Sequence, residues 1–307
     1  MVLNYIVKRL VAMVITLIAV ITLTFILMHL IPGGPFTAEK QLPEAVLDAM
    51  NKKYHLDDPL WKQYLDYLKA VLKFDLGPSF KHAGVTVNQL IKEGFPATFK
   101  VGFTSLLIII LLGIPLGVVS AIKHNRWQDG VIMLLTTLGV AVPSFVIATG
   151  LIYVFSSKYN ILPSNGLTSW RHMIIPVIAI SGFSLSYITR LTRSSMLEIL
   201  KLDYIRTARA KGLSNGKVIY KHALKNALIP VVTYLGPLVA SLLTGSFIIE
   251  KIFAINGIGK YFVESVGNRD YTVLMGITLF YGLILVLMVL LVDIIYGFID
   301  PRIKMED

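Results

Sequence analysis

Apolar residues in this chain form long blocks, and most polar residues are collected in the connections between them. A helix needs about 20 mostly apolar residues to cross a bilayer, where hydrocarbon offers the backbone no hydrogen-bond partner. Six blocks are candidates for such spans, at residues 10–31, 101–122, 131–156, 173–188, 228–249 and 273–295. The pattern predicts an all-α polytopic membrane protein with six transmembrane helices.

Two of the blocks have features that compete with a spanning helix. The first follows Lys8 and Arg9, as a signal peptide would, but it is longer than a signal sequence's apolar core and no small-residue cleavage pattern follows it. We therefore expect a retained span. The fourth is the shortest block and contains Pro176 and Gly182, which weaken a helix; we keep it as a span.

Composition excludes a fully soluble or a disordered chain. Apolar and aromatic residues make up 55% of the 307 residues and charged residues only 15%, against about a quarter charged in globular proteins. The chain contains no cysteine, which excludes disulfide frameworks, thiolate metal sites and cysteine nucleophiles.

The distribution of basic residues predicts the orientation. The net charge is +11, and with the N-terminus inside, the inner segments carry fifteen lysines and arginines against five in the two short outer connections. Basic residues favour the cytoplasmic side of a membrane. Both termini are therefore expected in the cytoplasm, together with the strongly basic segment 189–227. Segment 32–99 is expected outside.

The outer segment 32–99 is charge-balanced and has the pattern of short amphipathic helices. Asp58 and Pro59 precede a run with apolar residues at helical spacing, which predicts a helix capped by Asp58. Thr86 and Gln89 have the spacing of a capping box, which predicts a second helix start. The segment could be a structural cap over the bundle or a docking surface for an extracellular partner.

The basic inner segment contains two short predicted helices. Asp203 can cap the first, Gly212 suits the left-handed position that ends it, and Ser214 or Asn215 opens the second, which runs to Ile229. Two helices with a glycine turn could be a DNA-binding helix-turn-helix, but spans on both sides hold the element at the membrane surface, so no nucleic acid partner is expected. A basic loop that binds anionic headgroups is the other alternative.

Segments 203–213 and 222–230 resemble the coupling loop of binding-protein-dependent ABC importer permeases. In that family the loop sits in a groove of a cytoplasmic ATPase. The general family pattern opens with Glu-Ala-Ala, and this chain departs from it with Arg206-Thr207-Ala208 while keeping Gly212. The run 206–212 is the form typical of the peptide and nickel branch. The resemblance assigns the following residues to the ATPase-coupling loop: Asp203, Tyr204, Arg206, Thr207, Ala208, Ala210, Lys211, Gly212 and Leu213.

The resemblance extends over the whole chain, through segments 32–36, 54–59, 76–80, 192–196, 268–271 and 300–303. Segment 77–80 and the short outer connection 157–172 look most like the oligopeptide-permease B-type subunit. The resemblance implies a type I ABC importer permease in three parts: residues 1–31 as inner segment and first span, 32–99 as extracytoplasmic helical segment, and 100–307 as a five-span core. Within the same branch, a dipeptide, glutathione or nickel permease is the alternative.

The resemblance also implies the partners, the energy source and the compartment. A second homologous permease, cytoplasmic ATPase subunits and an extracytoplasmic peptide-binding protein would complete the transporter, with ATP and Mg bound by the ATPases and no cofactor or metal held by this chain. The membrane would be the inner or plasma membrane of a prokaryote.

The sequence contains no nucleotide-binding or hydrolase motif, so a chain that moves solute uphill must take its energy from a partner or an ion gradient. An ion-coupled secondary transporter is the rival from another class, but it needs an intramembrane carboxylate near the midplane, and Asp293 lies near one end of its block. A membrane-embedded hydrolase is a third alternative, but the sequence contains no hydrolase motif that supports it. Ser181, Ser184 and Ser186 could line a polar substrate path, or could bond within their own helix.

Overall fold

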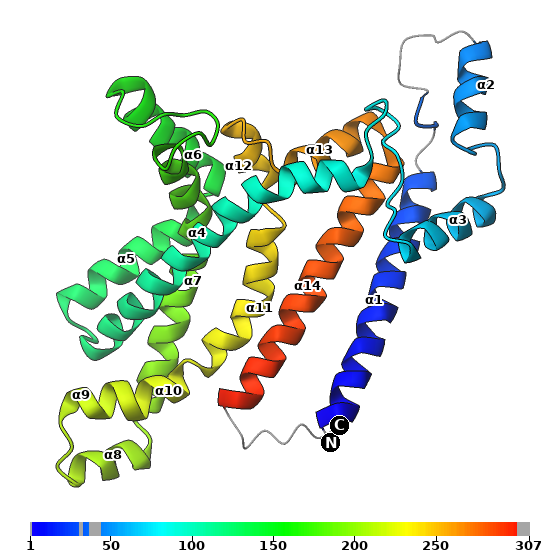
Figure 1. Cartoon of the computed structure of the whole chain (residues 1–307). Helices are drawn as coiled ribbons and strands as arrows, with labels where there is room; N and C mark the ends of the chain where they lie inside the picture. The colour runs from blue at the N-terminus through cyan, green and yellow to red at the C-terminus, as the bar shows by residue number, and fades with distance from the viewer. Residues whose placement is uncertain (1, 31–32, 37–43, 300–307) are drawn as a thin grey trace.

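The computed structural model describes residues 2–30, 33–36 and 44–299, and all regular elements within these ranges are helical. Five candidate spans are long and apolar enough to cross a membrane (Figure 1). These are α1 (Val2–Leu30), α4 (Val87–Ile122), α7 (Arg171–Ile199), α11 (Ile229–Leu243) with α12 (Phe247–Ile252), and α14 (Tyr271–Ile299). They confirm five of the six predicted blocks and the all-α fold.

The remaining block, 131–156, is bent. Helix α5 (Trp127–Ala141) meets α6 (Ser144–Leu151), which continues as a π-helix over Ile152–Lys158, at an angle of 102°. Val142 is extended, with φ −92° and ψ 122°, and Pro143 occupies the N-cap of α6. Proline disfavours a helical conformation in the residue before it and cannot donate a backbone hydrogen bond. The expected single helix is therefore corrected to a broken pair, which makes a sixth crossing only if both halves are counted together.

Helix α7 lies at the centre of the bundle, packed mainly against α4 and also against α5, α6 and α11 (Figure 1). Glycines allow the close approach, because a Cβ at Gly117 would overlap Thr192 of α7 and one at Gly102 would overlap the Leu242 carbonyl of α11. Helix α14 packs against α11 on one side and α1 on the other, so α1 lies at the edge of the bundle.

The outer segment forms two helices, α2 (Glu44–Lys53) and α3 (Leu60–Leu72). Pro59, not Asp58, holds the N-cap of α3, and the Asp58 carboxylate instead pairs with Lys62 at 3.0 Å. Side chains of α3 pack against α1 and α14. Helix α3 is thus fixed to two spans, as expected for a structural cap over the bundle.

The predicted capping box is confirmed at the start of α4. Gln89 N–H donates to Thr86 Oγ1 at 3.3 Å, and Thr86 N–H donates to Gln89 Oε1 at 2.9 Å. From there α4 runs to Ile122 as one helix. The expected division between outer segment and permease core, at residues 99 and 100, falls inside this continuous helix.

A buried carboxylate ties the outer segment to the last span. Asp270 is 2% exposed and directly precedes α14. It accepts backbone N–H bonds from Phe80 at 3.1 Å and Lys81 at 3.2 Å, and a short bond from the Ser79 hydroxyl. The segment that leads into α4 is thereby held against the start of α14.

Candidate functional site

The inner loop folds as the two predicted helices. The first is α8 (Asp203–Ala210); the second is built from α9 (Asn215–Lys217), a π-helical turn over Val218–Ala223 and α10 (Leu224–Ala227). Leu202 holds the N-cap of α8, so Asp203 is not the cap. It lies in the first turn, where the helix dipole favours a negative charge. The second helix ends before Ile229, and Pro230 lies in the first turn of α11.

Gly212 makes the turn between the helices. Its φ is +77°, the left-handed conformation that the sequence predicts, and its N–H donates to the Arg209 carbonyl at 2.9 Å. A Cβ built at Gly212 would have nothing within 4 Å. The position therefore needs glycine for its backbone angle and not for lack of space.

An apolar core fixes the loop to the bundle at the ends of α4 and α7. Ile205 and Ala208 of α8 are buried with Val218, Ala223 and Ala227 of the second helix. They pack against Val118 and Ala121 at the end of α4 and Met196 of α7. Tyr204 joins the two helices, since its hydroxyl donates to the His222 carbonyl at 3.3 Å and accepts from Asn226 Nδ2 at 2.8 Å. The loop is thus packed onto the ends of α4 and α7 (Figure 1).

The predicted coupling residues divide between two faces of this loop. Ala208 is buried and Leu213 is half-buried against the core. The others are exposed: Asp203, Tyr204, Arg206, Thr207, Ala210, Lys211 and Gly212. In addition to Arg206 and Lys211, four further basic side chains are exposed on the two helices: Arg209, Lys217, Lys221 and Lys225. The exposed surface of the loop is therefore strongly positive, which suits a protein groove or an anionic surface.

The three candidate path serines are buried in α7, away from the loop. Ser186 donates to the Gly182 carbonyl at 2.8 Å and lies against Gly139 of α5, where a Cβ would overlap it. Ser181 Oγ is buried and receives no hydrogen bond from the described residues. These contacts place Ser186 at a helix interface within this chain. A role for Ser181, Ser184 and Ser186 in a substrate path stays a prediction.

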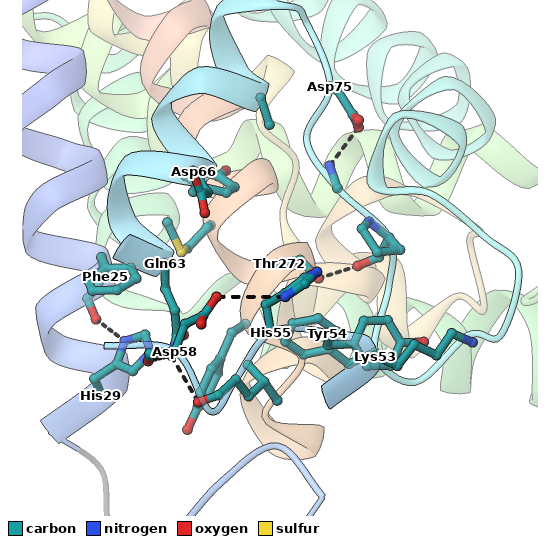
Figure 2. A pocket seen from close by; sticks show the side chains of 18 residues that line it. Phe25, His29, Lys53, Tyr54, His55, Asp58, Gln63, Asp66, Asp75 and Thr272 are labelled. Carbon is teal, nitrogen blue, oxygen red and sulfur yellow. Dashed lines mark hydrogen bonds and ion pairs between the residues drawn. The ribbon is translucent and has the colours of Figure 1, made fainter. Parts of the chain in front are cut away.

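A pocket of about 360 Å³ opens in the outer segment, between the end of α1, α3 and the start of α14 (Figure 2). Its walls combine aromatic side chains with acidic and basic groups, including Lys53, Asp58 and Asp75. Burial raises the pKa of the Tyr67 phenol at the pocket wall. Sequence reasoning missed this pocket because its walls come from segments far apart in the chain. Within the described residues no cluster of three histidines or carboxylates could hold a metal ion.

Two family patterns match this chain. Residues 113–305 match the binding-protein-dependent transport system inner membrane component, and residues 2–102 match the corresponding N-terminal membrane component. The chain also resembles the inward-facing MetNI methionine ABC transporter, with a TM-score of 0.53, 18% identity, and coverage of 70% of this chain and 97% of that one. At this identity the likeness shows a shared fold.

Curated relatives match over nearly the full length. The dipeptide transport system permease protein DppB of Bacillus subtilis is 51% identical, covering 99% of this chain and 98% of the relative. The oligopeptide transport system permease protein OppB of Salmonella typhimurium is 41% identical, covering 98% and 99%. DppB of Lactococcus lactis is 40% identical over a similar share. The chain therefore belongs to the inner membrane components of binding-protein-dependent transport systems, in the peptide-permease branch of the ABC importers.

Proposed function

We propose that this chain is the permease subunit of an ATP-driven peptide importer, which couples to ATPase subunits through the loop at 203–230. The observation that carries the proposal is the geometry of this loop. Two short helices are fixed by a common core to the inner ends of α4 and α7, and they expose a basic face and the Gly212 turn. A loop anchored in this way transmits a push on its outer face directly to two central helices.

The other parts of the proposed transporter follow from the family. A second homologous permease encloses the translocation path with this chain, cytoplasmic ATPases bind ATP and Mg, and an extracytoplasmic binding protein delivers the peptide. The chain lies in the cell membrane of a prokaryote with both termini in the cytoplasm. In this scheme segment 32–99 faces the binding protein. The boundary at residue 100 separates two functions and not two structural units, since α4 crosses it without a break.

The sequence features favour oligopeptides as the substrate, and the relatives support dipeptides as the second candidate. The 51% identical protein is named as a dipeptide permease and the 41% identical one as an oligopeptide permease. Both align with this chain over nearly their whole length. Peptide length is therefore left to the uptake experiment.

The test is reconstitution in liposomes with the second permease, the ATPases and the binding protein. We expect uptake of labelled peptide that requires ATP and is absent when the ATPases are omitted. Competition by unlabelled dipeptides and pentapeptides then distinguishes the two substrate classes. Peptide uptake by this chain alone, driven by a proton or sodium gradient, would replace the proposal with a secondary transporter.

A further inference from the structure

A buried ion pair joins α5 to α7 near their inner ends. Asp129, in the first turn of α5, is 4% exposed. Arg193 of α7 donates to it twice, from Nε to Oδ1 at 2.7 Å and from Nη2 to Oδ2 at 2.8 Å. Two parallel charge-assisted bonds fix the relative orientation of the two helices as well as their separation.

The rest of the Asp129 carboxylate is held by the end of α4 and the connection after it. The Ser120 hydroxyl donates to Oδ1 and Asn125 N–H donates to Oδ2 at 3.0 Å. His124 Nδ1 lies 3.2 Å from Oδ2 and 3.0 Å from Arg193 Nη2. Both carboxylate oxygens therefore have protein partners, and the cluster is a joint between three helices and not a ligand site.

A second contact lies about one turn earlier in α7. Arg190 donates from Nε to Thr136 Oγ1 at 3.1 Å and from Nη2 to Thr137 Oγ1 at 2.5 Å. Both threonines already donate to the Met133 carbonyl within α5. Both hydroxyls therefore donate within α5 and accept from Arg190, which connects α5 to α7. We call Asp129, Thr136, Thr137, Arg190 and Arg193 the α5–α7 clasp.

The helix that carries both arginines also carries the coupling loop. Met196 follows Arg193 by three residues on α7 and is fully buried. It packs in the same core as Ile205 and Val218 of the loop. Helix α5 packs chiefly against α7 and α4. A displacement of the loop therefore reaches α7 by direct packing, and it reaches α5 through the clasp and the contacts around it.

We propose that Arg190 and Arg193 are positioning residues for transport, which make α5 move together with α7 and the coupling loop as one unit. This inference rests on the proposed function, because an ATPase must move the loop. The partners of Arg190 on α5 are neutral hydroxyls, so its two bonds add to the contact that the ion pair makes between the same helices. The clasp thus fixes α5 at two levels along α7.

The test uses variants that leave no buried charge unpaired. Arg190→Met removes the outer level, and Asp129→Asn with Arg193→Met removes the ion pair from both sides. Arg126→Met is the matched control, since Arg126 is exposed at the N-cap of α5 at the same end of the bundle. In reconstituted transporter we expect ATPase binding and ATP hydrolysis to persist in both clasp variants. Peptide uptake per ATP hydrolysed should fall about tenfold or more, within the range typical of coupling between sites.

Spin labels measure the movement directly, since the chain has no native cysteine. Leu134→Cys on α5 and Ser194→Cys on α7 are exposed positions. The distance between the labels should be the same without nucleotide and with ATP bound in the parent and in Arg126→Met, and it should change with ATP in the clasp variants.

A nucleotide-dependent distance in the parent, or unchanged uptake per ATP in the clasp variants, would overturn the inference. If the double variant does not accumulate, Arg190→Met alone decides the outcome, since it leaves the ion pair in place. If the parent transporter takes up no peptide, the proposed function is contradicted. The distances between the spin labels test the clasp independently of that result.

Discussion

Gly212 offers the sharpest test of the coupling loop at the scale of one residue. A leucine there meets open space and costs only the strain of a left-handed backbone, roughly 1 kcal/mol. The Gly212→Leu protein should therefore accumulate in the membrane at the parent level. Its side chain would lie on the exposed turn, so co-purification of the ATPases and peptide uptake should fall severely.

Gly166 is a matched control for this substitution. It has φ +80° and nothing within 4 Å of a built Cβ, but it lies in the outer connection. Gly166→Leu should leave uptake and ATPase binding near the parent values. Normal uptake with Leu at position 212 would argue for a loop that only contacts lipid headgroups.

A second residue-scale prediction concerns the buried Glu250. This side chain is 2% exposed and accepts a bond from Thr98 Oγ1 at 2.8 Å. A methyl group at Gly257 would overlap its carboxylate and lie 2.6 Å from Thr98 Oγ1. Overpacking of this kind costs about 1–3 kcal/mol, so Gly257→Ala should lower the thermal unfolding temperature in detergent.

Gly267→Ala in the neighbouring helix α13 (Ile258–Asn268) is the control, because its Cβ would have nothing within 4 Å. Alanine favours a helix over glycine by about 1 kcal/mol, so this variant should unfold at or above the parent temperature. Equal unfolding temperatures for the two variants would contradict close packing of Gly257 against Glu250.

Which residues could be predicted depended on the range of their contacts. The Thr86–Gln89 capping box and the Gly212 turn are confirmed because each is decided within a few neighbouring residues. The Asp129–Arg193 pair joins helices that are far apart in sequence, and no local spacing marks either residue. The N-caps expected at Asp58 and Asp203 were each wrong by one residue. Pro59 holds the N-cap of α3, and Leu202 holds that of α8.

At the scale of elements, the orientation of the spans is open to a direct test. Single cysteines replace Lys62 on α3 and Lys217 at the start of the second loop helix, both exposed positions. The cysteine at position 62 should react with a membrane-impermeant reagent in intact cells, and the one at 217 only after lysis. The reverse pattern would invert the topology and contradict the cytoplasmic position of the loop.

The helices themselves were predictable from the length and polarity of their blocks, and the bend was not. Average hydropathy identifies a run of apolar residues, but it does not predict the extended conformation that Pro143 imposes on Val142. The same limitation shortened the fourth block, since α7 continues to Ile199 through polar residues that bond within the bundle, such as Arg190 and Arg193.

At the scale of the whole molecule, the chain contains more than the fold that it shares with the methionine transporter. The methionine transporter subunit is covered almost completely, yet it accounts for 70% of this chain. The separate N-terminal family match, residues 2–102, includes α1, α2 and α3, which wall the outer pocket together with the start of α14 (Figure 2). No single block of sequence predicts that pocket, because it exists only once α1 and α14 are side by side.

The bend between α5 and α6 also limits what can surround this chain in the membrane. Pro143 cannot donate to the Gly139 carbonyl, as the corresponding residue of an unbroken helix would, and the backbone there needs another hydrogen-bond partner. Hydrocarbon supplies none, and irregular backbone at membrane depth occurs only against protein or water. Yet Val140, Ala141 and Pro143 are exposed on this chain alone. At membrane depth, lipid tails would thus be an unfavourable neighbour for this corner, and contact with protein or with water would be favoured there.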